Sequence, residues 1–91
     1  MKMKVFATFR EICGNKTIHV PFEDGDTIGK LLQSVIEQYP PMQEELFENE
    51  DELKPHIHVF INGKNVIHMN GLETEVEKSD ELALFPPVAG G

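Results

Sequence analysis

Basic residues and cysteine are scarce in this chain, and each shortage argues against a class of protein. Eight Lys and Arg residues stand against sixteen Asp and Glu residues, so the net charge of the 91 residues is −8. Nucleic acid requires a basic footprint for its phosphates, so we expect no nucleic-acid partner. The acidic excess favours solubility, or steering toward a basic partner. The single Cys13 excludes a disulfide within the chain and fits a reducing cytoplasm, where we expect the protein to act.

Long apolar runs and catalytic clusters are also missing. A membrane span needs about 18 consecutive apolar residues, which the chain lacks, and Lys2 and Lys4 interrupt the only apolar stretch that could be a signal peptide. His56 and His58 have no third ligand nearby in the sequence, so we predict no metal site. No nucleophile, base and orienting residue occur together, so we expect a protein without catalytic residues of its own.

Alternating and helical patterns fill the rest of the chain. Residues 2–9, KMKVFATF, alternate in hydrophobicity and predict a strand, with Met3, Val5, Ala7 and Phe9 on its buried face. A turn at 13–15 and a strand at 17–22 complete a predicted hairpin. Apolar residues then recur with helical spacing at Ile28, Leu31, Leu32, Val35 and Tyr39.

The predicted helix has clear boundaries. Asp26 or Thr27 can cap its start, and Pro40 and Pro41 end it. Gly29 is unexpected in the first turn, and we interpret it as a sign of close packing between helix and sheet.

The second half of the chain predicts more strands. An acidic segment, 42–55, is predicted to be a short helix and a loop. Strands are predicted at 56–61, 64–67 and 81–85, with a hairpin turn at Asn62–Gly63 and a connecting turn at 68–80. We therefore predict an α+β fold in which a mixed sheet of about five strands packs on one main helix. Residues 1–85 form this domain, and 86–91 form an extended tail.

The same alternation places three aromatic rings on the face of the sheet turned away from the helix. Phe6, Phe60 and Phe85 lie at outward positions of three strands that we expect to be adjacent, and His58 shares that face. Gathered aromatic side chains indicate a partner-binding surface. As an alternative, segment 42–55 covers the rings, or a bulge in one strand moves a ring off this face.

The order of elements, together with three motifs, resembles a known family. VFATFREICG near the start, INGK at the third turn and DELALFPPVAGG at the end lie where the β-grasp, ubiquitin-like sulfur carriers of the MoaD and ThiS type have their counterparts. The Phe-Pro-Pro-Val stem is similar to the small subunit of molybdopterin synthase, and the long acidic segment 42–55 is similar to archaeal small modifier proteins.

This resemblance implies a function for the C-terminal residue. A MoeB-like adenylyltransferase would use ATP to adenylate the carboxylate of Gly91, and sulfur would replace the adenylate to give a thiocarboxylate. The sulfur would pass to a pterin precursor in a MoaE-like large subunit of molybdopterin synthase. The chain itself would bind no cofactor.

The tail residues suit that chemistry. Gly90 and Gly91 have no side chains to obstruct a narrow channel. Pro86 and Pro87 favour an extended conformation that projects the tail off the sheet, and Val88 and Ala89 form a slim stem. The same activated tail could instead be joined to protein lysines, as in a ubiquitin-like modifier, or could supply sulfur for thiamine or for tRNA thiolation.

Overall fold

The computed structural model describes residues 1–49 and 52–87 and has twelve elements. In chain order they are β1 (Lys2–Val5), α1 (Thr8–Cys13), β2 (Thr17–His19), α2 (Ile28–Gln38), α3 (Met42–Leu46), β3 (Phe47–Asn49), β4 (Glu52–Leu53), β5 (His58–Ile61), β6 (Lys64–Asn65), the 3-10 helices η1 (Val66–His68) and η2 (Gly71–Glu73), and β7 (Leu82–Phe85). In this part of the chain, no helix has the length and apolar character needed to cross a bilayer.

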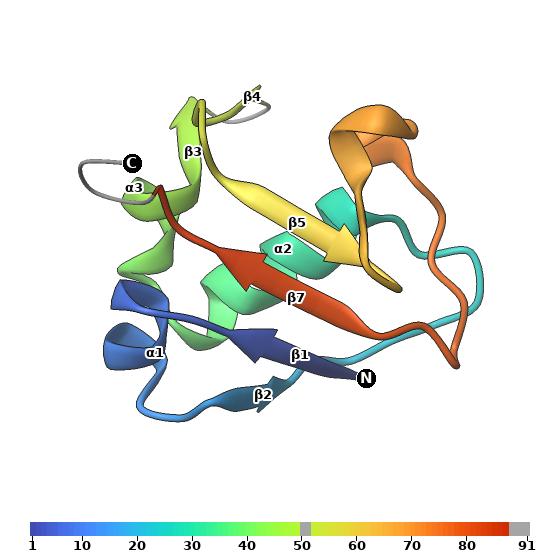
Figure 1. Cartoon of the computed structure of the whole chain (residues 1–91). Helices are drawn as coiled ribbons and strands as arrows, with labels where there is room; N and C mark the ends of the chain where they lie inside the picture. The colour runs from blue at the N-terminus through green and yellow to red at the C-terminus, as the bar shows by residue number, and fades with distance from the viewer. Residues whose placement is uncertain (50–51, 88–91) are drawn as a thin grey trace.

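The main sheet has five strands in the order β2-β1-β7-β5-β6. The first and last strands, β1 and β7, lie side by side and parallel, and every other pair in this sheet is antiparallel. The helix α2 crosses behind the sheet and covers one face, as Figure 1 shows. This mixed sheet on one main helix confirms the predicted α+β, β-grasp architecture.

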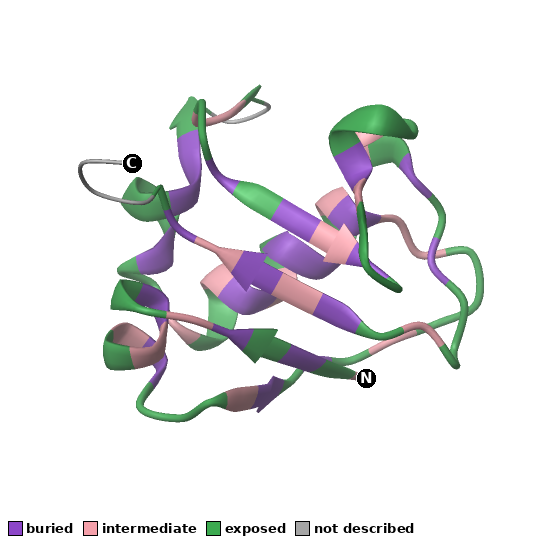
Figure 2. Ribbon diagram, in the orientation of Figure 1, coloured by how far each residue is buried: buried purple, intermediate pink, exposed green. Residues whose placement is uncertain are grey.

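The core lies between α2 and the sheet. The apolar stripe of α2 is buried as predicted at Ile28, Leu31, Leu32 and Val35, while Tyr39 follows the helix and is only partly buried. The hydroxyl of Thr27 accepts a hydrogen bond from the backbone N–H of Lys30 at 3.3 Å, so Thr27 rather than Asp26 caps the helix. Along β1 and β7 buried residues alternate with more exposed ones (Figure 2). In the described part of the chain, no helix covers the face of the sheet opposite α2 (Figure 1).

The prediction of a strand through residue 9 was wrong. The strand ends at Val5, and the chain turns at Ala7, whose φ of 51° lies in the left-handed region, into α1. Ala7 is therefore exposed, whereas Phe9 is buried from a helix rather than from a strand. Gly14 ends α1 with a φ of 76°, so the predicted turn at 13–15 leads from a helix into β2.

Other segments differ from the prediction in detail. The short helix predicted in 42–55 is present as α3, but two strands, β3 and β4, pair where a loop was expected. The strands predicted at 17–22 and 64–67 are shorter, and residues 66–68 form η1. The strand predicted from residue 56 begins at His58, because His56 has a φ of 70°. The hairpin turn at Asn62–Gly63 is confirmed, with φ values of 49° and 83°.

Gly29 has a packing role, but against a different partner from the one predicted. A Cβ added at Gly29 would lie 3.2 Å from the backbone oxygen of Leu72, in η2, rather than against the sheet. The η2 segment is tied to the start of α2 by two hydrogen bonds, from the N–H of Ile28 to the oxygen of Thr74 and from the N–H of Val76 to the oxygen of Asp26. Glycine therefore lets α2 approach this segment closely.

Candidate functional site

The uncovered face of the sheet carries a row of aromatic rings. β7 lies between β1 and β5 in continuous register, so the outward residues of these strands are neighbours. The rings of Phe6 and Phe85 are stacked, with centroids 4.3 Å apart, and Phe60 meets Phe85 edge-on at 5.2 Å. The structure therefore brings together the three rings that the sequence placed on one face, and no register irregularity interrupts these strands.

The rings are partly buried by one another and by one cation. Phe6, Phe60 and Phe85 each retain intermediate exposure. The guanidinium of Arg10, in α1, lies 5.3 Å from the centroid of the Phe6 ring, and its Nε donates to the backbone oxygen of Val5 at 3.3 Å. Arg10 was not predicted to belong to this site, because the alternating pattern of residues 2–9 predicts a strand and not the helix that carries Arg10.

His58 extends the row on β5 and is held in a defined orientation. Its ring is nearly parallel to that of Phe60, with centroids 6.3 Å apart. The amide oxygen of Asn65 accepts from the N–H of Ile67 at 3.1 Å, so the amide nitrogen faces Nδ1 of His58, 2.9 Å away. In this arrangement Nδ1 accepts, which corresponds to the tautomer with its proton on Nε2. His58 thus offers a hydrogen-bond donor to solvent on an exposed side chain.

The face leads directly into the C-terminal stem. Phe85 is the last residue of β7, and the next residue, Pro86, is buried, while Pro87 is exposed. Pro86 is thus packed into the domain surface, although it was predicted to belong to the projecting tail. The predicted stem and terminal residues, Val88, Ala89, Gly90 and Gly91, lie outside the described residues.

The other candidate residues, Cys13, His56 and His58, do not form a second site among the described residues. Cys13 is buried, and this burial raises the pKa of its thiol above the ordinary value of 9.0, which disfavours the reactive thiolate. His56 lies outside β5 and so does not share a strand face with His58. Within residues 1–49 and 52–87, no group of three or more His, Cys, Asp or Glu side chains could hold a metal ion.

Comparisons with known proteins agree with this architecture. A profile of the ThiS family matches residues 3–91. Small archaeal modifier protein 3 of Haloferax volcanii is 40% identical over 91 residues, which cover 100% of this chain and 98% of the relative. A protein of Archaeoglobus fulgidus, described as a proposed sulfur carrier, is 48% identical over 65 residues, which cover 71% of this chain and 74% of the relative.

Solved structures extend the likeness to the fold. The crystal structure of small archaeal modifier protein 1 of Haloferax volcanii has a TM-score of 0.87 and 35% identity, covering 100% of this chain and 98% of that one. A structure from Pyrococcus furiosus, described as a proposed molybdopterin converting factor subunit 1, has a TM-score of 0.76 and 26% identity, covering 96% and 95% of the two chains. The chain therefore belongs to the ThiS family, a family of small ubiquitin-like sulfur carriers and protein modifiers.

Proposed function

We propose that this protein is a sulfur carrier that is activated at the carboxylate of Gly91 and acts as the small subunit of molybdopterin synthase. The single observation that carries the proposal is the aromatic row on the uncovered face of the sheet. The rings of Phe60 in β5, Phe85 in β7 and Phe6, which directly follows β1, meet beside the point where β7 leads into Pro86 and Pro87. A partner docked on this face would lie next to the segment that leads to Gly91.

The proposed chemistry begins with adenylation. An oxygen of the Gly91 carboxylate attacks the α-phosphorus of ATP, pyrophosphate leaves, and an acyl adenylate forms. Hydrosulfide then attacks the acyl carbon, AMP leaves, and the product is a thiocarboxylate on Gly91. Because a free carboxylate is a poor acyl electrophile, a MoeB-like adenylyltransferase supplies the active site and the ATP. The carrier supplies the docking face and the tail.

In the third step, the thiocarboxylate donates its sulfur to a pterin precursor held by a MoaE-like large subunit, and an oxygen from water takes its place on the acyl carbon of Gly91. We place all three steps in the cytoplasm, in keeping with the free thiol of Cys13. Phe6, Phe60, Phe85 and His58 are the docking residues in this proposal. Partly exposed aromatic rings are common energetic anchors of protein interfaces. The donor on Nε2 of His58 would give such an interface a directional contact.

A second candidate function is supported by the relatives. The two modifier proteins of Haloferax volcanii match all of this chain at 40% and 35% identity. By analogy with their names, the activated Gly91 would be transferred to lysine side chains of other proteins. Both functions share the adenylation step, and they differ in the nucleophile that attacks the adenylate.

Two experiments test these proposals. With the MoeB-like adenylyltransferase of the same genome, the chain should promote exchange of labelled pyrophosphate into ATP. A chain in which Gly91 is deleted should not do so. A tagged chain expressed in its own organism should then give one band on a denaturing gel if it only carries sulfur. A ladder of heavier species with Gly-Gly remnants on lysine would instead support the modifier function.

A further inference from the structure

The charges of this acidic protein are unevenly distributed along the chain. Four of the eight basic residues, Lys2, Lys4, Arg10 and Lys16, fall within the first twenty positions, where Glu11 is the only acidic residue. All other acidic residues come after position 20. The N-terminal segment is therefore basic, although the net charge of the whole chain is −8.

The fold places this basic segment beside the aromatic row. Lys2, Lys4 and Phe6 alternate with the buried Met3 and Val5, so the two lysines lie on the same uncovered face as the rings. In the register of the sheet, Lys4 lies between Thr17 of β2 and Ala83 of β7. α1, which carries Arg10, lies at the end of the sheet where β1 and β7 both finish (Figure 1).

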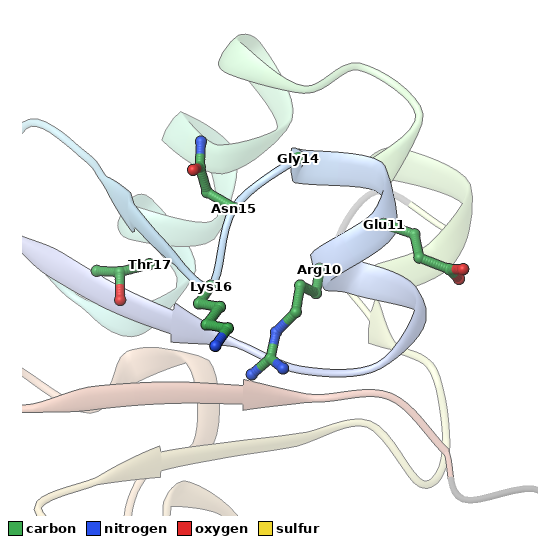
Figure 3. Close-up of a pocket in the computed structure, with 6 residues that line it drawn as sticks. All are labelled: Arg10, Glu11, Gly14, Asn15, Lys16 and Thr17. Atoms are coloured by element: carbon green, nitrogen blue, oxygen red, sulfur yellow. The ribbon is translucent and has the colours of Figure 1, made fainter.

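Arg10 and Lys16 approach each other at this end of the sheet. Both line an open pocket of about 690 Å³, and Figure 3 shows their side chains extending toward the same place while Glu11 points away. The one ion pair in the described part of the chain joins Lys30 and Asp26, so neither Arg10 nor Lys16 has a carboxylate partner there. Two neighbouring cations without a counter-charge favour an incoming anionic group.

The opposite end of β1 is different. There Lys2, Lys4 and Lys78 share a pocket with Asp80 and Glu81, so carboxylates already lie close to these lysines. At the Arg10 end, the one acidic residue that lines the pocket, Glu11, points away from the two cations (Figure 3). This end also lies nearest to Phe85 and to the start of the stem.

We infer that the docking face selects a partner protein whose apolar patch is bordered by carboxylates, which meet Arg10 and Lys16 while the patch covers the aromatic row. The inference rests on the proposed function, since the partner is taken to be the adenylyltransferase that activates Gly91. It differs from the expectation from net charge alone, which favoured solubility or steering toward a basic partner. Nucleic acid fits this face less well, because the Phe6 and Phe85 rings stack on each other, and the acidic remainder of the chain repels phosphates.

The test compares two charge reversals of equal size in the pyrophosphate-exchange assay with the MoeB-like adenylyltransferase. The double variant R10E/K16E reverses the two cations, and the matched control K30E/K64E makes the same change on α2 and β6. R10E/K16E should raise the KM for the carrier about tenfold or more with little change in kcat, because charges at an interface rim act mainly on encounter. The control should leave KM within about twofold of wild type.

Salt and a second variant strengthen the test. The KM of the wild-type chain should rise with ionic strength, and that of R10E/K16E should not, because exposed charges are screened within about 10 Å at 0.1 M salt. K4E/K16E retains the contact of Arg10 with Phe6 and should show the same direction of change. It therefore gives the answer if R10E/K16E fails to fold, as judged by circular dichroism.

The outcomes separate the two proposals. Exchange with wild type but equal KM values for R10E/K16E and K30E/K64E would overturn the inference and leave the proposed function intact. No exchange with wild type would overturn both. If the wild-type chain sediments as a dimer that R10E/K16E abolishes, the face binds a second copy, and the assignment to an acidic partner protein is wrong. If RNA inhibits exchange with the wild-type chain but not with R10E/K16E, the face binds nucleic acid, and the inference of an acidic partner protein is also wrong.

Discussion

The ring of Phe6 stacks on the ring of Phe85, with centroids 4.3 Å apart and planes inclined by 7°. Phe6 follows the first strand and Phe85 ends the last, so this contact joins the two ends of the domain across the parallel pair β1 and β7. The same ring of Phe85 also meets Phe60, edge-on, with centroids 5.2 Å apart. Phe85 is thus the centre of the proposed docking face as well as the residue that precedes the stem.

A charge at position 60 should weaken partner binding without a loss of stability, because Phe60 lies on the exposed face of the sheet. Phe60→Asp leaves the stack of Phe6 and Phe85 in place but puts a charge on the apolar face. We expect the affinity for the MoaE-like large subunit to fall at least tenfold, about 1.4 kcal/mol or more, as for an interface anchor. The melting temperature should change little, since the ring is partly exposed.

The matched control is Met69→Asp, which places the same charge on an exposed apolar residue outside the row. Titration calorimetry on the three proteins gives the comparison. Equal affinities for Phe60→Asp and wild type would remove Phe60 from the interface. A large loss of melting temperature would show that its ring belongs to the core.

Gly29 gives a prediction about the packing of α2. Alanine normally stabilises a helix by about 1 kcal/mol relative to glycine. Here the new Cβ would lie 3.2 Å from the oxygen of Leu72, in a segment held by hydrogen bonds to the start of α2. We expect the energetic cost of overpacking to exceed the stabilisation from the helix propensity of alanine. The free energy of unfolding should therefore fall by about 1 kcal/mol.

Urea denaturation of Gly29→Ala measures this loss. The control Gln33→Ala, at an exposed position of the same helix, should change the free energy of unfolding by less than about 0.5 kcal/mol. A Gly29→Ala protein more stable than wild type would mean that the η2 segment moves away at little cost.

Cys13 predicts a pH dependence of stability. Burial raises the pKa of its thiol in the folded protein above 9.0, so the unfolded chain loses its proton first as the pH rises. The stability that this thiol contributes is therefore fully present below pH 9.0 and is lost as the pH rises through the folded pKa. Urea denaturation of wild type and Cys13→Ala, from neutral pH to about pH 10, isolates the contribution of the thiol. Parallel stability curves for the two proteins over this range would contradict it.

A residue added to the C-terminal tail should abolish pyrophosphate exchange without changing the fold. One alanine added after Gly91 moves the carboxylate beyond its proposed position, so pyrophosphate exchange should be lost while the circular dichroism spectrum is unchanged. Gly91→Ala keeps the length of the chain and its terminal carboxylate, and it should retain part of the activity. Full exchange with the extended chain would show that the position of the carboxylate is not critical.

Periodicity in the sequence predicted the elements that depend on it. The stripe of α2 and the Asn62–Gly63 turn follow from side-chain spacing and from the positive φ angles that Asn and Gly tolerate. The aromatic row was predictable because Phe6, Phe60 and Phe85 keep the outward parity of their strands. Alternation along one strand is a local property of the sequence. Because the register of the sheet is continuous, the outward residues of adjacent strands become neighbours.

The elements that were not predicted from the sequence depend on unusual local backbone geometry. An alternating pattern continues through Phe9, and the break comes from a positive φ at Ala7, which alanine rarely adopts. α1 has only six residues, too few to establish a helical period. Because Arg10 lies on that helix, its position over Phe6 and its approach to Lys16 could not be predicted from the sequence.

The central claim is that Gly91 becomes a thiocarboxylate, and intact-mass spectrometry tests it most directly. The chain is incubated with the MoeB-like adenylyltransferase, ATP and a sulfur source, and a reaction without ATP serves as the control. The account predicts a mass increase that corresponds to replacement of one oxygen by sulfur, located on Gly91 by fragmentation and absent from the control. An unchanged mass, with an adenylyltransferase that is active on another carrier protein, would contradict the account.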